Sequence, residues 1–237
     1  MNDELSDITR GFVFAVEPIV NISTGQCAGV EVLAIKSPYW AHARWRAWYA
    51  ALPDIVNYVR RVEGLKAAQY VAINVDSDQI TDRYIYSSLC KNDENTVLEW
   101  TERLPKHWKR AESLIKRAAA GLERLRKEKN LRISFDDFGS GIDGYQRLGL
   151  LEPDYIKIDG NVLHGARTNG RHMYLLKHMV NLANDMRVKT VVEWVETQTD
   201  RHLVAASGAD CAQGYFFGRR EYGGDGLIAE KPSIVNV

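Results

Sequence analysis

Short runs of apolar and β-branched residues alternate along the chain with longer stretches in which apolar positions recur every three or four residues. Eight of the short runs predict buried β-strands, because polar or turn-forming residues bound each of them. These runs are residues 12–18, 29–35, 70–75, 96–100, 131–135, 155–158, 189–194 and 209–215.

Most gaps after the second predicted strand are long enough for a helix. The clearest helical pattern covers residues 108–129, where apolar residues from Leu114 to Leu125 share one face. Residues 171–186 form a second pattern of this kind. Alternation of buried strands with helices favours a parallel sheet.

The first two predicted strands are joined differently. Residues 19–28 are turn-like and too short for a crossover helix, so these two strands should be antiparallel. Eight strands within 237 residues then predict an α/β fold, a closed (β/α)8 TIM-like barrel with an antiparallel strand near the N-terminus. We expect a single domain over residues 1–237, with about residues 1–10 as an N-terminal tail.

Nearly every predicted strand carries a polar side chain at or near its carboxyl end, although a buried strand should be apolar. One such residue can be a turn former or a helix cap, but seven strands with the same feature indicate a site. In (β/α)8 barrels this rim holds the active site. The residues are Glu31, Asn74, Glu99, Asp136, Asp137, Lys157, Glu193 and Gln213.

These side chains suit a narrow range of chemistry. Carboxylate and amide oxygens are hard ligands that favour Mg²⁺ or Mn²⁺, and the absence of histidine from the set argues against zinc. The adjacent Asp136 and Asp137 could ligate two metals, the arrangement used to cleave phosphodiesters, or could cap the next helix. Lys157 could hold a water or a phosphate oxygen, or could pair with Asp159 at the surface.

Composition narrows the setting. Lys plus Arg and Asp plus Glu each number 31, so the chain lacks the basic excess of a nucleic-acid polymer binder. Its three cysteines, Cys27, Cys90 and Cys211, form no CxxC pair, which fits a reducing, cytoplasmic location. The acidic first residues do not form a signal peptide, and no apolar run approaches the roughly 20 residues of a membrane span.

With these residues assembled, the chain resembles the EAL domain family of cyclic-di-GMP phosphodiesterases over nearly its whole length. "GVEVL" is similar to the Glu-Ala-Leu motif itself, with Val32 in place of Ala. Each motif alone is weak, but eight occur in the family's order. The others are "FAVEPIV", "INVD", "LEWTE", "DDFGSG", "YIKID", "VVEWVET" and "CAQGYFFG".

The resemblance implies a role for each residue. The implied metal ligands are Glu31, Asn74, Glu99 and Asp136, with Asp137 on a second metal. The implied catalytic residues are Lys157 and Glu193, which would position or activate the water, together with Glu31. The implied substrate contacts are Glu17, Ile35 and Gln213. Glu102 would hold the loop after Asp137, and Asp159 and Glu196 would support the site.

The chain departs from the family pattern at several positions. Ile35 stands where active members carry an Arg that meets a substrate phosphate, and its loss should weaken binding. Glu17 replaces a Gln but can still accept the N1 and N2 protons of guanine. The loop "SGIDGYQRL" differs from the family's. Trp194 replaces a small residue, but its side chain should face away from Glu193.

The resemblance implies a cytoplasmic, two-metal phosphodiesterase, with Mg²⁺ or Mn²⁺, that opens cyclic di-GMP to linear pGpG. It also implies a homodimer, with the loop after Asp137 linking the dimer interface to the site. The alternative is a non-hydrolysing member that binds cyclic di-GMP or a protein partner as a regulator. An enzyme acting on another phosphate ester is a third, lesser alternative. We expect no nucleic-acid polymer and no membrane among its partners.

Overall fold

The computed structural model describes residues 7, 9, 11–37, 42–103, 108–140, 144–224 and 226–231. Its strands are β1 (Val13–Asn21), β2 (Cys27–Lys36), β3 (Val71–Val75), β4 (Thr96–Trp100), β5 (Arg132–Phe138), β6 (Tyr155–Ile158), β7 (Lys189–Val192), β8 (Cys211–Gln213), β9 (Arg219–Gly223) and β10 (Gly226–Lys231). Its helices are α2 (His42–Arg61), α3 (Ser77–Thr81), α4 (Arg83–Leu89), α5 (Trp108–Lys129), α6 (Gly144–Leu148), α7 (Gly160–Ala166), α8 (Gly170–Asp185) and α9 (Gln198–Ser207), with a 3-10 turn η1 (Tyr215–Phe217).

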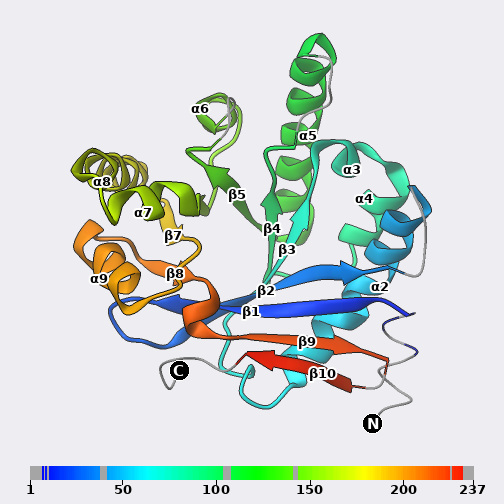
Figure 1. The fold of residues 1–237 in the computed structure, drawn as a ribbon. Coiled ribbons are helices and arrows are strands. Elements are labelled where there is room, and N and C mark those ends of the chain that lie inside the picture. Colours follow the sequence, from blue (N-terminus) through cyan, green and yellow to red (C-terminus); the bar gives the residue numbers. More distant parts are fainter. Residues whose placement is uncertain are drawn as a thin grey trace.

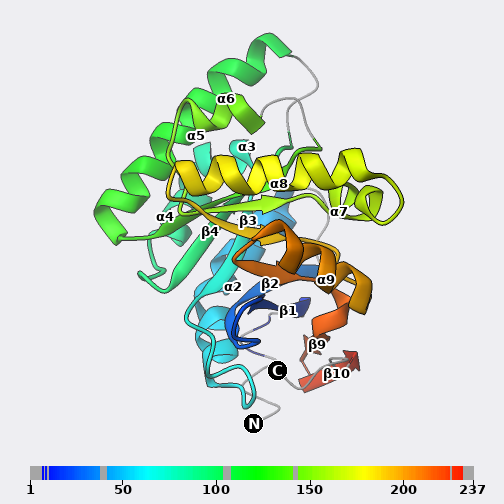
Figure 2. The same ribbon diagram turned by 90° about the vertical axis from the view of Figure 1, so that its left-hand side faces the viewer.

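Strands β1 to β8 form a closed barrel, as predicted. Neighbours from β2 to β8 pair in parallel, while β1 is antiparallel to both β2 and β8 and closes the ring. The helices lie outside the strands: α2 to α5 on one side and α7 to α9 on the other (Figure 1). The view turned by 90° shows α7, α8 and α9 side by side over one flank of the sheet (Figure 2).

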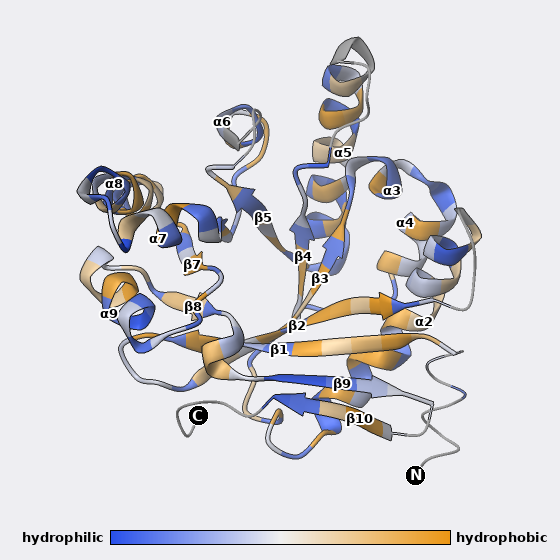
Figure 3. Ribbon diagram, viewed as in Figure 1, coloured by the Kyte–Doolittle hydropathy of each residue, from blue (hydrophilic) through white to orange (hydrophobic). Residues whose placement is uncertain are grey.

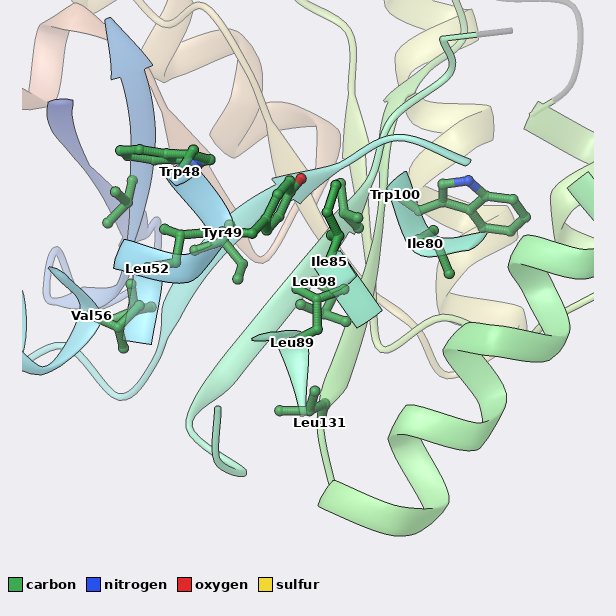
Figure 4. Close-up of a cluster of buried hydrophobic side chains, with 14 of the residues drawn as sticks. Trp48, Tyr49, Leu52, Val56, Ile80, Ile85, Leu89, Leu98, Trp100 and Leu131 are labelled. Atoms are coloured by element: carbon green, nitrogen blue, oxygen red, sulfur yellow. The ribbon is translucent and has the colours of Figure 1, made fainter. Parts of the chain in front are cut away.

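The predicted helical patterns are confirmed. Helix α5 covers residues 108–129, and the residues on its apolar face, Leu114, Ala118, Leu122 and Leu125, are all buried. Burying such a stripe against the sheet removes apolar surface from water, at roughly 25 cal/mol per Å². Figure 4 shows part of the resulting core, where side chains of α2, α3 and α4 meet Leu98, Trp100 and Leu131.

Inside the barrel an apolar layer lies beneath a polar one. Ala72, Val97, Val191 and Cys211 belong to one buried cluster and come from four different strands. Because successive side chains of a strand alternate between its faces, the residue two positions later on each strand also points inward. Those later residues are Asn74, Glu99, Glu193 and Gln213. The strand period thus places predicted site residues on an apolar floor.

Two further strands, β9 and β10, were not predicted. They extend the sheet outward from β1, where Phe14, Ala15 and Val16 pair with Tyr222, Glu221 and Arg220 (Figure 1). Strand β9 is largely hydrophilic, in contrast to the apolar β1 beside it (Figure 3). A short charged segment carries no strand signal of its own, and it forms a strand here because β1 offers it an edge.

The N-terminal tail predicted over residues 1–10 lies mostly outside the described residues. None of the helices in the described part of the chain combines the length and apolarity needed to cross a bilayer. The prediction of one domain over residues 1–237 stays a prediction.

Candidate active site

The side chain of Lys157, on β6, lies at the centre of the polar layer. Its Nζ atom is buried within ion-pair distance of four carboxylates that come from four other strands or strand ends. The distances are 3.1 Å to Glu31, 2.9 Å to Glu99, 3.0 Å to Asp136 and 2.9 Å to Glu193. Residues far apart in the sequence are thus brought together at the carboxyl ends of the parallel strands, where barrel active sites lie.

One ammonium cannot balance four buried carboxylates. Burial alone would lower the pKa of Lys157, but the charges of Asp136, Glu193, Glu31 and Glu99 raise it well above its ordinary value. Burial, together with Glu31, raises the pKa of Glu99, and burial likewise raises the pKa of Glu193. Such shifts mark a site with excess negative potential, which favours cations.

Amide groups complete the ligand set. Asn74 donates to Glu31 Oε1 at 2.5 Å, and Gln213 donates to Glu31 Oε2 at 2.6 Å. Their own oxygens, Asn74 Oδ1 and Gln213 Oε1, are buried without a hydrogen-bond partner among the described residues. Unpaired buried acceptors are costly, so both oxygens suit a ligand that supplies positive charge or a proton.

The donor set fits a hard divalent cation. Within the described part of the chain, Asp136, Asp137 and Glu193 each offer a carboxylate oxygen within 4.8 Å of the other two. Asp137 is half-buried, its backbone is left-handed at φ 54°, and burial beside Asp136 raises its pKa to about 6. Oxygen-only ligands of this kind match Mg²⁺, Mn²⁺ or Ca²⁺ better than zinc.

Glu17 forms a second charged contact beside this set. Glu17, on β1, pairs directly with Glu31, on β2. Arg219 Nη1 lies 2.5 Å from Glu17 Oε1. Gln213 Nε2 is 3.4 Å from the other oxygen of Glu17. Sequence reasoning missed Arg219, because an Arg in the charged run that became β9 has no spacing that marks it.

A cavity of about 390 Å³ opens above the polar layer. Its floor includes Glu31, Asn74, Asp136, Lys157, Glu193 and Gln213, and its walls include Glu17, Leu33, Glu196, Trp194 and Tyr215. Trp194 was expected to face away from Glu193, but it lines the same cavity as Glu193. Strand β7 ends at Val192, and Trp194 has φ 57°, so strand alternation no longer sets the direction of its side chain.

The remaining predicted residues lie around this cavity. Ile35 is 45% exposed and is not among the described residues that line the cavity. Asp159 is buried and caps α7 through the backbone N–H of Asn161, at 2.7 Å, rather than pairing with Lys157. Glu196 is exposed at the rim, with its Oε2 atom 3.2 Å from Arg167.

Glu102 follows β4, and its Oε2 atom is buried without a hydrogen-bond partner among the described residues. The loop that it was predicted to hold includes residues 141–143, which lie outside the described residues. Two aromatic residues of α2, Trp48 and Tyr49, are buried in the core. The Trp48 ring meets the Phe12 ring edge-on, with 5.2 Å between the ring centroids.

Arg147, on α6, is a further residue that sequence reasoning missed. It is buried, and it donates to the backbone carbonyl of Trp100 at 2.5 Å and to that of Asp136 at 2.9 Å. Its guanidinium also lies over the rings of Trp100 and Phe135. It therefore ties together the ends of β4 and β5, which carry Glu99 and Asp136. The sequence around it looks like an ordinary short helix.

Comparison with known proteins gives the same assignment. The EAL domain family matches residues 3–220. The chain is 28% identical over 224 residues to the probable cyclic di-GMP phosphodiesterase PdeG of Escherichia coli. The aligned region covers 85% of this chain and 43% of PdeG. It is 35% identical over 88 residues to the cyclic di-GMP phosphodiesterase TpdA of Vibrio parahaemolyticus. This aligned region covers 37% of this chain and 15% of TpdA.

Solved structures support the fold. An EAL domain protein from Listeria monocytogenes superposes with a TM-score of 0.71 at 19% identity, over 92% of both chains. Klebsiella pneumoniae BlrP1, in a complex with manganese and cyclic di-GMP, gives a TM-score of 0.73 at 20% identity, over 93% of this chain and 58% of BlrP1.

The chain spans only 12–43% of the length of the first curated relatives that it matches. The family match nevertheless covers nearly the whole of this chain and every site residue described above. The chain belongs to the EAL domain family.

Proposed function

We propose that this chain is a divalent-metal-dependent phosphodiesterase that hydrolyses cyclic di-GMP to linear pGpG. The observation that carries the proposal is the convergence of four carboxylates on Lys157 at the floor of a cavity. Membership of the EAL domain family and similarity to relatives named as cyclic di-GMP phosphodiesterases support it.

In this proposal Glu31, Asn74, Glu99, Asp136 and Asp137 hold two divalent cations, Mg²⁺ or Mn²⁺. When bound, such cations polarise a phosphate oxygen and lower the pKa of water. The unpaired oxygen of Asn74 and the excess of buried carboxylates support this assignment. The complex of BlrP1 with manganese and cyclic di-GMP is a precedent for metal binding within the same fold.

Other residues of the chain would activate the water and contact the nucleotide. Lys157 is positioned to donate to the attacking water or to a phosphate oxygen, and Glu193 to accept the proton of that water. Gln213 and Glu17 line the cavity and offer hydrogen-bonding groups to a guanine edge. Glu102, Asp159 and Glu196 support the surrounding segments from the end of β4, the cap of α7 and the cavity rim, respectively.

The alternative is a member that binds cyclic di-GMP or a protein partner without hydrolysing the nucleotide. One observation favours it: Ile35 is exposed and brings no cation to the cavity where the resemblance calls for an Arg. A homodimer, the protein partner and a cytoplasmic location remain proposals drawn from the resemblance and the composition.

Incubation of the purified protein with cyclic di-GMP and Mn²⁺ or Mg²⁺ separates the two. The phosphodiesterase produces pGpG, and Glu31→Ala abolishes that product. Tight binding of cyclic di-GMP without pGpG would favour the regulator.

A further inference from the structure

The indole of Trp194 is an exposed aromatic surface inside the cavity. The side chain is 47% exposed and lines the cavity whose floor holds Lys157 and Glu193. Two other tryptophans, Trp48 and Trp100, are 4% and 0% exposed. Leaving so large an apolar ring in water gives up the free energy that its burial would contribute.

The backbone at this position also opposes a large side chain. Trp194 has φ 57°, in the left-handed region that glycine adopts readily and bulky residues rarely adopt. The residue is therefore held in a costly conformation at a position that lines the cavity. Strained residues of this kind cluster at ligand-binding sites.

The ring is held in place from behind. A Cβ atom added to Gly160 would lie 2.3 Å from Cγ of Trp194, so the indole rests directly against that glycine. The His164 ring lies tilted at 5.8 Å, and His164 Nε2 is 2.9 Å from the backbone oxygen of Trp194. The ring thus packs against α7, while Trp194 as a whole stays 47% exposed.

Tyr215 is the other exposed aromatic residue of the cavity, at 42%. Its ring already has a partner, because Lys231 Nζ lies 4.2 Å from the ring centroid. The contacts of the Trp194 ring are with Gly160 and His164, and its side chain is more exposed than that of Tyr215. Trp194, which has no cation over its ring among the described residues, is therefore the better stacking surface for a planar ligand.

We propose that Trp194 is a stacking platform for a purine base of the bound nucleotide, next to the site that takes the phosphate. The inference rests on the proposed function, since the charged floor is assigned there to a phosphodiester. It adds a base-binding residue supplied by this chain. Stacking of a base on an aromatic side chain contributes about 1–3 kcal/mol, so its loss should weaken binding about five-fold to 150-fold.

The test compares Trp194→Gly and Trp194→Phe with the wild type and with Tyr174→Ala, an exposed aromatic on α8 that does not line the cavity. Affinity is measured calorimetrically with cyclic di-GMP in Ca²⁺ buffer, with recovery of the intact nucleotide checked. We expect roughly ten-fold weaker binding for Trp194→Gly, near wild-type binding for Trp194→Phe and no change for Tyr174→Ala. Because glycine relieves the backbone strain, Trp194→Gly should unfold within a few degrees of the wild type.

Fluorescence gives a second readout. Cyclic di-GMP should quench tryptophan emission in the wild type and much less in Trp194→Phe, even though Trp194→Phe still binds. Wild-type affinity in folded Trp194→Gly, or equal quenching in Trp194→Phe and the wild type, would overturn the inference alone. Absence of cyclic di-GMP binding by the wild type would overturn the proposed function, and the inference with it.

Discussion

Lys157 and Glu31 form an ion pair across the inside of the barrel, with Nζ 3.1 Å from Oε2 and 126 positions between the two residues in the chain. Both side chains are buried. Removing one partner of a buried charge network leaves the other charges uncompensated, which typically costs 3–5 kcal/mol. Lys157 is therefore important for the fold of the site as well as for the chemistry proposed for it.

Substitution Lys157→Met should lower the unfolding temperature and remove phosphodiesterase activity. It leaves Glu31, Glu99, Asp136 and Glu193 without their shared cation, so added Mn²⁺ should raise the unfolding temperature more in the variant than in the wild type. Calorimetric melts with and without Mn²⁺ measure this difference. Lys177→Met, at an exposed position of α8, is the matched control. Equal Mn²⁺ shifts in variant and wild type would contradict the assignment.

Arg147→Ala should destabilise the protein by about 3 kcal/mol, because two buried carbonyls lose a charged donor. For a domain of this size that corresponds to an unfolding temperature about 10 °C lower. Since Arg147 ties together the ends of β4 and β5, Mn²⁺ affinity should also fall, and Arg147→Lys should restore it only in part. Titration with Mn²⁺ measures this effect. Arg171→Ala, at an exposed position, should change neither stability nor affinity; unchanged Mn²⁺ affinity in a folded Arg147→Ala would argue against the positioning role.

The Glu17–Arg219 pair should show strong coupling in a double-mutant cycle. Both side chains are largely buried, at 11% and 17% exposure. Burial and Glu31 raise the pKa of Glu17, and Arg219 opposes that rise. Arg219→Ala should therefore destabilise the protein more in the Glu17 background than in the Glu17→Gln background, by at least about 1 kcal/mol. Chemical denaturation of the four proteins gives the coupling energy, and additive effects would show that the pair contributes no net stability.

Asp200 should make the fold sensitive to acid. Burial raises the pKa of Asp200, but hydrogen bonds from Arg167, the Glu196 backbone and Thr197 bring it down to about 2. Because this folded-state pKa lies below the unfolded value near 3.9, the stabilisation is complete above about pH 4 and is lost as the pH falls towards 2. The lost stability is about 2 kcal/mol.

Urea denaturation at several pH values checks this prediction. Asp200→Asn should be less stable than the wild type at pH 7, and the difference should shrink between pH 4 and pH 2. A constant difference across that range would show that Asp200 is not held ionised in the way described.

The fold was predictable because strand and helix periods are local. Each predicted strand carried its own apolar pattern. The connection between the first two strands, which is residues 22–26 in the structure, is short and determines the antiparallel pairing of β1 with β2. Strands β9 and β10 could not be predicted, since β9 forms only against the edge of β1, and β10 only against β9.

The site residues that lie at the carboxyl ends of strands could be predicted, because these strand ends converge in a barrel. The period of two explains why Glu99 and Glu193 join Lys157 above Val97 and Val191. Arg147 and Arg219 escaped notice because their roles depend on contacts with residues distant in the chain. The place of Trp194 in the cavity wall was missed because a left-handed backbone conformation in a non-glycine residue has no clear sequence signature.

The most direct measurement of the central claim is the formation of pGpG from cyclic di-GMP by the purified chain in Mn²⁺, with parallel reactions in EDTA and with Glu31→Ala. We expect pGpG only in the reaction of the wild-type chain with Mn²⁺. Any folded variant that keeps the cavity should still bind cyclic di-GMP. Absence of pGpG from folded, Mn²⁺-loaded wild-type protein over hours would contradict the account, and pGpG formation at the wild-type rate by Glu31→Ala would contradict the assigned site.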